Sequence, residues 1–208
     1  MPAAGSGEGR PRVCGIDEAG RGPLAGPVCA AAVILPGDFP RDLLGDSKKL
    51  SLAARERAMR ALYSSAAAWG IGWASAAEID EINILRASLL AMKRAVEAML
   101  RQFAGPLGAA AGEAAMPRGL TAIADGRHVP DIPIPCRAQV KADALVPEVM
   151  AASILAKTAR DRMMDRYSWL YPEYGYDRHK GYPTKEHREL VLRLGPSPIQ
   201  RMSFRVRL

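Results

Sequence analysis

Two apolar segments near the N-terminus, joined by a glycine-rich stretch, restrict the possible folds of this chain more than any other feature. Residues 13–18 and 28–35 are short and apolar, which is typical of β-strands, and the glycines and prolines between them indicate a turn. The first segment ends in two adjacent carboxylates, Asp17 and Glu18, and a Gly-Arg-Gly sequence at 20–22 follows at once. The sequence therefore predicts a strand that carries acid into a tight turn.

The residue types in this turn point to a particular chemistry. Carboxylates on a rigid strand can bind hard divalent cations through oxygen. Glycines such as Gly20 and Gly22 let backbone amides approach a phosphate or a sugar closely. A metal site beside a backbone-reading loop indicates chemistry on a nucleic-acid backbone.

The rest of the chain alternates predicted strands and helices. Hydrophobic periodicity and capping residues predict the following elements: helix 51–64 with its cap at Ser51, strand 70–75, a long helix to about 103, strands 120–124 and 136–141, helix 149–167, and helix 185–194 capped by Thr184. The Ala/Gly/Pro-rich segment 104–119 is predicted to be a flexible surface loop, and residues 1–11 a disordered tail. This order predicts an α/β fold, a mixed central sheet flanked by helices.

Two further acidic residues follow predicted strands. Asp125 comes after the strand at 120–124, and Asp143 comes after the strand at 136–141. In open α/β sheets, active-site groups gather where strands end. Together with Asp17 and Glu18 these residues would form a cluster of four carboxylates, which repel one another unless cations lie between them. Two divalent ions meet that need, one activating water and one stabilising the leaving oxygen.

Two features of this cluster need explanation: how Asp17 and Glu18 can face the same site, and which residue is the fourth ligand. Neighbouring residues of a strand face opposite sides, so we expect the first strand to end or distort at Glu18, helped by Gly20. Asp161 and Asp165 are alternatives for the fourth ligand. Because Asp161 lies four residues after Lys157 on a predicted helix, where a surface ion pair is favourable, Asp143 is preferred.

Charge is unevenly distributed along the chain. The 208 residues carry a net charge of +7, and residues 157–208 alone hold twelve basic and six acidic side chains. Five of the six tyrosines and Trp169 fall in that region. Cations interleaved with aromatic rings suit nucleic acid, although packing onto the domain is the alternative for any one ring.

Composition bounds the protein class. The length and a 49% apolar content fit one globular domain. Cys14, Cys29 and Cys136 are odd in number and in no metal-binding spacing, which indicates a reducing compartment. The longest apolar run, 28–35, is too short to span a bilayer. We expect a cytoplasmic protein without membrane contact, monomeric by default.

The sequence resembles the ribonuclease HII family over nearly its whole length. The resemblance rests on motifs in matching order and spacing: G-I-D-E-A-G-R-G-P-L-A-G-P-V from Gly15, D-S-K-K-L from Asp46, N-I-L-x-A from Asn83, D-G at Asp125, A-A-S-I-L-A-K-x-x-R-D from Ala151 and H-K-G-Y-P-T-K-E-H from His179. Two departures are Ala142, where the family usually has glycine, and the tail I-Q-R-M-S-F at 199–204, which partly matches the family's H-R-x-S-F.

The resemblance implies a ribonuclease H-like fold for residues 12–208, including a C-terminal helical region (about 165–208) that clamps the substrate. It implies endonucleolytic cleavage of RNA in RNA–DNA hybrids and of single ribonucleotides embedded in duplex DNA. The hypothesis is two-ion catalysis with Mg²⁺ or Mn²⁺, giving a 3′-hydroxyl and a 5′-phosphate. Asp17 would bridge both ions, Glu18 and Asp125 would complete one coordination sphere, and Asp143 would complete the other.

The resemblance also implies roles in substrate binding. Gly20, Arg21 and Gly22 become the loop that reads the 2′-hydroxyl, the group that distinguishes RNA from DNA. Tyr182 becomes the ring packed on the sugar of the next deoxynucleotide, and a core tyrosine is the alternative.

Other polar residues have open assignments. Ser47, Lys48 and Lys49 either hold a phosphate near a helix N-terminus or are solvated beside a cap. Lys157 and Arg160 either face the substrate, which we slightly favour, or pair locally. Ser153 either contacts the acidic site or simply lies in its helix. His179 is expected to organise its loop, and His187 to belong to the capped helix or to contact phosphate.

Two rival functions remain at this stage. A non-catalytic hybrid-binding protein is one, although four acids in a cleft would weaken such a binder. An enzyme of the ribonuclease HIII type, preferring continuous hybrids, is the other; the Gly-Arg-Gly sequence and the lack of a long N-terminal platform domain favour the HII type.

Overall fold

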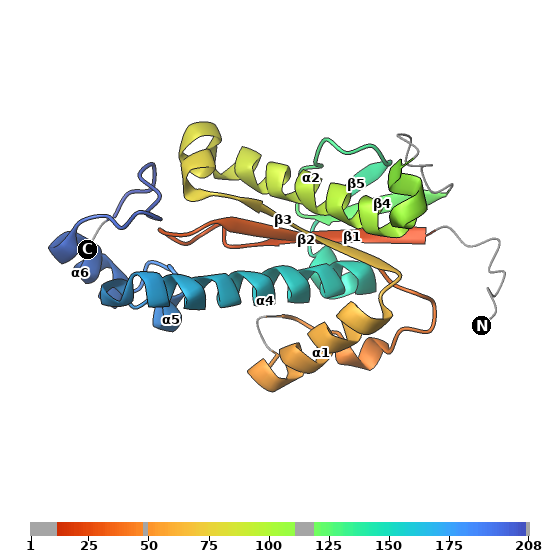
Figure 1. The fold of residues 1–208 in the computed structure, drawn as a ribbon, viewed down its shortest axis with the longest axis horizontal. Coiled ribbons are helices and arrows are strands. Elements are labelled where there is room, and N and C mark those ends of the chain that lie inside the picture. The colour runs from red at the N-terminus through yellow and green to blue at the C-terminus, as the bar shows by residue number, and fades with distance from the viewer. Residues whose placement is uncertain (1–11, 48–49, 111–118, 207–208) are drawn as a thin grey trace.

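A computed structural model describes residues 12–47, 50–110 and 119–206. Its centre is a five-stranded sheet in the order β3-β2-β1-β4-β5 (Figure 1). The strands are β1 (Arg12–Ala19), β2 (Val28–Ile34), β3 (Ala68–Ala74), β4 (Leu120–Asp125) and β5 (Cys136–Gln139). The β1–β2 and β2–β3 pairs are antiparallel, whereas β1–β4 and β4–β5 are parallel. The predicted mixed sheet is confirmed.

Helices cover both faces of this sheet. The helical elements are the 3₁₀ turn η1 (Arg41–Leu43), α1 (Leu52–Ser65), α2 (Ala76–Ala110), α3 (Ala142–Leu145), α4 (Pro147–Leu170), the 3₁₀ turn η2 (Pro172–Tyr174), α5 (Tyr176–His179) and α6 (Lys185–Leu194). The two predicted caps are present, since Ser51 accepts the Ala54 amide and Thr184 accepts the His187 amide.

The alternation of β1 and β2 decides which side chains meet which helix. Cys14 and Ile16 face α2, as do alternate residues of β2 such as Ala30. Cys29 and the other intervening residues of β2 face α1 and α4. In Figure 1, α2 lies on one side of the sheet and α4 and α1 lie on the other. Since β2 is buried on both faces, it forms the centre of the core.

Helix α4 continues toward a C-terminal group of short elements. Met164, Tyr174, Tyr176 and Ile199 form a separate apolar cluster there. Tyr174 and Tyr176 are therefore packing residues, whereas the Trp169 side chain is 80% exposed. None of the helices in the described part of the chain is both long and apolar enough to cross a membrane.

Two predictions about local structure need correction, and several short elements were not predicted. The loop predicted from residue 104 is wrong over its first part, because α2 continues through Ala110. Asp143 does not end a strand, since β5 stops at Gln139 and Asp143 lies in the short helix α3. The 3₁₀ turns and the four-residue helices α3 and α5 were not predicted, because elements this short carry no hydrophobic period. The predicted tail at 1–11 and the rest of the predicted loop, 111–118, lie outside the described residues.

Candidate active site

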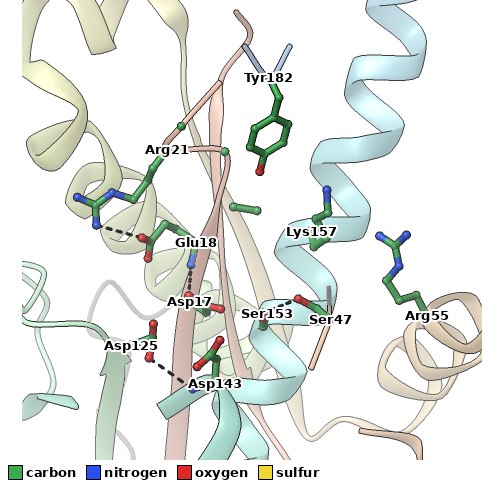
Figure 2. A pocket seen from close by; sticks show the side chains of 13 residues that line it. Asp17, Glu18, Arg21, Ser47, Arg55, Asp125, Asp143, Ser153, Lys157 and Tyr182 are labelled. Carbon is green, nitrogen blue, oxygen red and sulfur yellow. Dashed lines mark hydrogen bonds and ion pairs between the residues drawn. The ribbon is translucent and has the colours of Figure 1, made fainter. Parts of the chain in front are cut away.

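A cavity of about 590 Å³ opens at the end of β1 and β4 (Figure 2). It gathers residues far apart in the sequence, and these residues line it: Asp17, Glu18, Ala19, Gly20, Arg21, Gly22, Ser47, Arg55, Asp125, Asp143, Ser153, Lys157 and Tyr182. All four predicted metal ligands are among them. Two further predicted residues, Lys48 and Lys49, lie outside the described part of the chain.

Sheet register brings the first two carboxylates together. The parallel pairing of β1 with β4 ends at Ile16 and Ala124, so the next residues, Asp17 and Asp125, lie at the same level on adjacent strands. Both face the α4 side, because Ile16 and Ala124 face α2. Asp17 is only 6% exposed. The sheet therefore places two carboxylates side by side under α4.

Glu18 reaches the cavity by another route. The β1 strand stays regular through Glu18, which pairs with Ala30, and ends at Ala19. The first strand was expected to end or to distort at Glu18; it shows no distortion there and ends one residue later, before Gly20, so the expected end is confirmed to within one residue. Beyond Ile16, however, β1 has no strand on its β4 side. This open edge lets the Glu18 side chain border the cavity, where its Oε1 accepts a bond from Arg21 Nη1 at 3.2 Å.

Asp143 is placed by a turn after β5. Lys141 has a left-handed backbone (φ 60°) and starts α3, whose first amides point back toward β4. Asp125 Oδ1 accepts the Ala142 amide at 2.7 Å and the Asp143 amide at 3.4 Å. One carboxylate of the cluster thus fixes the segment that carries another (Figure 2).

The carboxylates interact unfavourably as charged groups. Burial, then the neighbouring charge of Glu18, and also that of Asp125, raise the pKa of Asp17 well above its usual value, although bonds from Ser153 and the Glu18 amide oppose the rise. Burial also raises the pKa of Glu18, and the Arg21 guanidinium opposes that rise. A bound cation would reduce the repulsion between these carboxylates and favour their charged forms.

The donor set fits hard divalent cations in its chemistry. Carboxylate oxygens are the ligands that Mg²⁺ and Mn²⁺ prefer. In the described part of the chain, no three acidic, histidine or cysteine side chains stand close enough together to ligate one ion. Asp17 and Asp125 accept backbone amides and Glu18 pairs with Arg21, so side chains must turn from these partners to close on an ion.

The Gly-Arg-Gly loop (residues 20–22) and Tyr182 lie next to each other where they line the cavity. A Cβ atom built on Gly22 would lie 3.8 Å from the Tyr182 ring. Tyr182 is 39% exposed, and Gly181 before it has a positive φ of 80°. Tyr182 is therefore available to a ligand, unlike the core tyrosines nearby.

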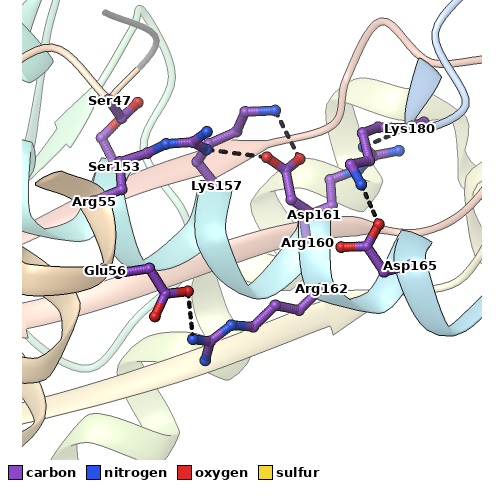
Figure 3. A network of polar contacts seen from close by, with 10 residues as sticks. All are labelled: Ser47, Arg55, Glu56, Ser153, Lys157, Arg160, Asp161, Arg162, Asp165 and Lys180. Carbon is purple, nitrogen blue, oxygen red and sulfur yellow. Dashed lines mark hydrogen bonds and ion pairs between the residues drawn. The ribbon is translucent and has the colours of Figure 1, made fainter. Parts of the chain in front are cut away.

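Cations and hydroxyls form the α1–α4 wall of the cavity (Figure 3). Lys157 Nζ and Arg55 Nη1 donate to opposite oxygens of Asp161, at 2.7 and 3.0 Å. The predicted Lys157–Asp161 pair is thus confirmed, and Asp161 holds two cations beside the cavity. Ser47 and Ser153 share a hydrogen bond of 2.9 Å. Ser153 also forms a hydrogen bond with Asp17, so of its two predicted roles the contact with the acidic site is the one observed.

Arg160 is placed differently from the other predicted substrate-binding residues. It is 1% exposed, and its guanidinium donates to the carbonyl oxygens of Ala25, Pro27 and Lys180. It pairs locally, so the favoured expectation of direct substrate contact is wrong for Arg160 in this structure.

The two histidines organise the segment that carries Tyr182. His179 Nδ1 accepts the Gly181 amide at 3.1 Å, and His187 Nδ1 lies 3.0 Å from the Tyr182 carbonyl oxygen. Burial lowers the pKa of both rings. The expectation that His179 organises its loop is confirmed. His187 is fully buried in helix α6, so of its two predicted roles it belongs to the capped helix.

Sequence reasoning missed two arginines at this site. Arg55 lines the cavity from α1, and its position four residues after the Ser51 cap was the available signal. Arg201 is fully buried and donates four hydrogen bonds to the loop after β1. The partly matching tail motif at 199–204 was the only sign of it.

The comparisons with known proteins agree with this geometry. The family model described as Ribonuclease HII matches residues 14–207. The chain belongs to the ribonuclease HII family. Ribonuclease HII of Treponema denticola is 55% identical over 94% of this chain and 98% of its own length, and that of Chlorobium luteolum is 48% identical over 94% and 89%. As a ribonuclease HII, the chain is an endonuclease of the ribonuclease H type that acts on RNA–DNA substrates.

Solved structures confirm the ribonuclease H-like fold. A ribonuclease H2 from Pyrococcus horikoshii has a TM-score of 0.67 at 25% identity, covering 94% of each chain. A ribonuclease HIII named Bst-RNase HIII, solved in complex with Mn²⁺, has a TM-score of 0.69 at 18% identity, over 93% of this chain and 67% of that one.

Proposed function

We propose that this enzyme cuts on the 5′ side of ribonucleotides, both in RNA–DNA hybrids and where a single ribonucleotide lies in duplex DNA. The observation that carries the proposal is the cavity itself, where Asp17 and Asp125 lie level under the Gly-Arg-Gly loop and Tyr182. Carboxylates on one side and a backbone loop facing an aromatic ring on the other suit hydrolysis at a sugar step rather than at a base sequence.

The carboxylate cluster would hold two divalent ions, Mg²⁺ or Mn²⁺, with Asp17 shared between them. Bound ions would supply the positive charge that activates water and stabilises the leaving oxygen. Bst-RNase HIII, which shares the fold, was solved with Mn²⁺. Hydrolysis would leave a 3′-hydroxyl and a 5′-phosphate.

The chain's own residues would read the sugar step. Among the described residues, the Arg21 and Gly22 amides have no protein acceptor, so they are available to the 2′-hydroxyl of the ribonucleotide. The exposed ring of Tyr182 would pack on the next sugar, where a second 2′-hydroxyl would be crowded. Lys157 and Arg55 line the same cavity and would face a nearby phosphate.

The remaining assignments belong to this proposal. Residues 12–208 would form one catalytic domain, with the segment from about 165 to 208 clamping the duplex. Ser47 lines the cavity and would hold a phosphate, and Lys48 and Lys49, which follow it in the sequence, would share that role.

The test is cleavage of an end-labelled DNA duplex that contains one ribonucleotide, with and without Mn²⁺ or Mg²⁺. We expect metal-dependent cutting immediately 5′ of the ribonucleotide and none in the all-DNA duplex. Loss of a residue that only supports a metal ligand costs about 10–100-fold, so Asp17→Asn, which removes a direct ligand, should lose more than about 100-fold. Cutting of equal rate in EDTA, or an undiminished rate in the variant, would refute the two-ion mechanism.

A binding measurement supports this test without relying on turnover. Mn²⁺ should raise the melting temperature of the wild-type protein, because an ion at 100 times its dissociation constant adds about 2.7 kcal/mol to the free energy of unfolding. Asp17→Asn should lose most of that rise. A melting temperature indifferent to Mn²⁺ would contradict the carboxylate site.

A further inference from the structure

The loop between β1 and β2 (residues 20–27, the β1–β2 loop) is held from beneath by two buried guanidinium groups. Arg201 donates from Nε to the Gly26 carbonyl oxygen at 2.8 Å and from Nη2 to that of Gly20 at 2.6 Å. Its Nη1 donates to the carbonyl oxygens of Arg21 and Pro23, at 3.0 and 2.8 Å. One side chain from the end of the chain therefore fixes four carbonyl groups of the loop.

Arg160 holds the same loop from α4 and also reaches the segment that carries Tyr182. Its Nη2 and Nε donate to the Ala25 and Pro27 carbonyl oxygens at 3.2 and 3.0 Å. Its Nη1 donates to the Lys180 carbonyl oxygen at 3.0 Å. The guanidinium carbon lies 5.8 Å from the centre of the Tyr182 ring. Arg160 thus connects the β1–β2 loop to the segment that carries Tyr182.

Glycine makes this close approach possible. Gly20 has a φ of 99°, and a Cβ atom there would lie 2.0 Å from Arg160 Nε. The Arg160 side chain therefore occupies the space that any other residue at position 20 would fill. Four carbonyl groups of the loop accept from Arg201, whereas the Arg21 and Gly22 amides have no protein acceptor among the described residues.

The tail that carries Arg201 is itself anchored. Asp80, near the start of α2, accepts the Met202 and Ser203 amides at 2.8 and 2.9 Å. The Arg201 amide donates to the Leu24 carbonyl oxygen at 2.9 Å, and the Phe204 ring lies 5.2 Å from its guanidinium carbon. In the described part of the chain, neither Arg201 nor Arg160 has an ion pair, so the carbonyl groups alone meet their hydrogen-bonding needs.

Keeping two charges buried in this way has a cost that a simple packing role would not require. Burial, together with the Arg160 charge, lowers the pKa of Arg201 to about 9. Apolar side chains of similar volume would fill the same space without that cost. The fork of guanidinium donors, however, can fix several carbonyl groups in one rigid arrangement.

We propose that Arg201 and Arg160 are positioning residues that set the selectivity of this enzyme for a ribonucleotide followed by a deoxyribonucleotide. The inference deepens the proposed function and rests on it. Arg201 fixes the Gly-Arg-Gly loop, and Arg160 fixes the distance from that loop to Tyr182. A displacement of about 1 Å at such a site can cost about 100-fold in rate.

The test uses Arg201→Lys and Arg160→Lys, which keep the charge but lose the fork of donors. For each we would measure kcat/KM on a duplex with one ribonucleotide and on a continuous RNA–DNA hybrid. We expect the ratio of the two values to fall about tenfold or more, because the hybrid places less demand on the junction geometry. Arg162→Gln is the control: this α4 arginine is half-exposed and pairs with Glu56 away from the cavity. It should leave the ratio unchanged.

A second readout separates this proposal from the proposed function. The Leu24 and Gly26 amides donate to the Gly181 and Ile199 carbonyl oxygens, both at 2.8 Å, so their hydrogen exchange reports whether the loop is attached. Exchange at both should accelerate in Arg201→Lys while exchange in α2 stays constant. Unchanged exchange there, or an equal loss on both substrates, would overturn the inference. If the wild-type enzyme ignores single ribonucleotides, the proposed function is wrong, and the exchange data still decide whether Arg201 holds the loop.

Discussion

Asp17 and Glu18 line the same cavity although the strand pattern alone would separate them. Asp17 and Glu18 are adjacent in sequence, and the alternation of a strand sends them to opposite faces. They share a cavity because β4 ends at the level of Asp125 and leaves the edge of β1 open. Burial raises the pKa of Asp17 most, and the nearby charges of Glu18 and Asp125 raise it further.

The raised pKa of Asp17 gives a prediction for the stability of the metal-free protein. Because the pKa of Asp17 is higher in the folded state than in the unfolded state, the folded protein binds more protons, and stability falls as the pH rises through that interval. Asp17→Asn removes the effect. In EDTA at neutral pH we expect the variant to melt at a higher temperature than the wild type, with the difference closing as the pH falls to about 4, the unfolded value.

Thermal unfolding across this pH range makes the measurement. Asp38→Asn is the matched control, since Asp38 is an exposed loop residue, and this variant should show no pH-dependent gain. A variant at Asp17 that is less stable than the wild type at neutral pH in EDTA would contradict the assigned cause.

The site depends on how closely helix α4 packs on strand β1. Gly15 lies two residues before Asp17 on the same face of the strand. A Cβ atom on Gly15 would lie 2.0 Å from the Glu148 carbonyl carbon and 2.2 Å from the Val149 amide nitrogen. The first turn of α4 therefore rests directly on the backbone of β1, and this contact sets the height of Ser153 over Asp17.

Gly15→Ala should therefore disturb both stability and the site. We expect a loss of about 1–3 kcal/mol in the free energy of unfolding, because the backbone of α4 must move away. Gly37→Ala is the control, because a Cβ atom there has no neighbour within 4 Å among the described residues. Urea unfolding of both variants measures the difference, and equal stabilities would show that α4 is free to shift.

The distribution of charge along the chain suits the binding of a polyanion. Residues 157–208 hold twelve basic and six acidic side chains of the whole chain's net charge of +7. Many of these pair internally, as Lys157 does with Asp161 and Arg178 with Glu186. The remaining excess lies in the proposed clamp, while the carboxylates lie apart in the cavity.

Binding should therefore depend strongly on salt. We expect the affinity of Asp17→Asn for an RNA–DNA hybrid to fall by about tenfold or more between 50 and 200 mM KCl, because bound cations are released from several phosphates. Fluorescence anisotropy without divalent metal measures this, and an all-DNA duplex should give a similar slope. Affinity independent of salt would exclude phosphate contacts as the main source of binding.

Local sequence patterns were enough to predict the secondary-structure elements and most of the chemistry. Apolar runs of the right length predicted the strands, Ser51 and Thr184 predicted two helix starts, and the motifs from Gly15 onward predicted the family. These signals are local, because the side-chain period and the capping hydrogen bonds act within a few residues. Cavity-lining residues such as Lys157 and Tyr182 could be named because they lie in motifs that resemble those of the family.

How those residues meet depends on contacts between elements that are far apart in the sequence. The register of β1 with β4 sets Asp17 level with Asp125, and a short helix without a periodic signal carries Asp143. Arg160 looked like a substrate contact, and Arg201 had almost no signal, yet both lie buried beneath the β1–β2 loop. Hydrogen bonds between residues some 180 positions apart have no trace in a local pattern, because they exist only once the sheet and α4 have brought the chain's ends together.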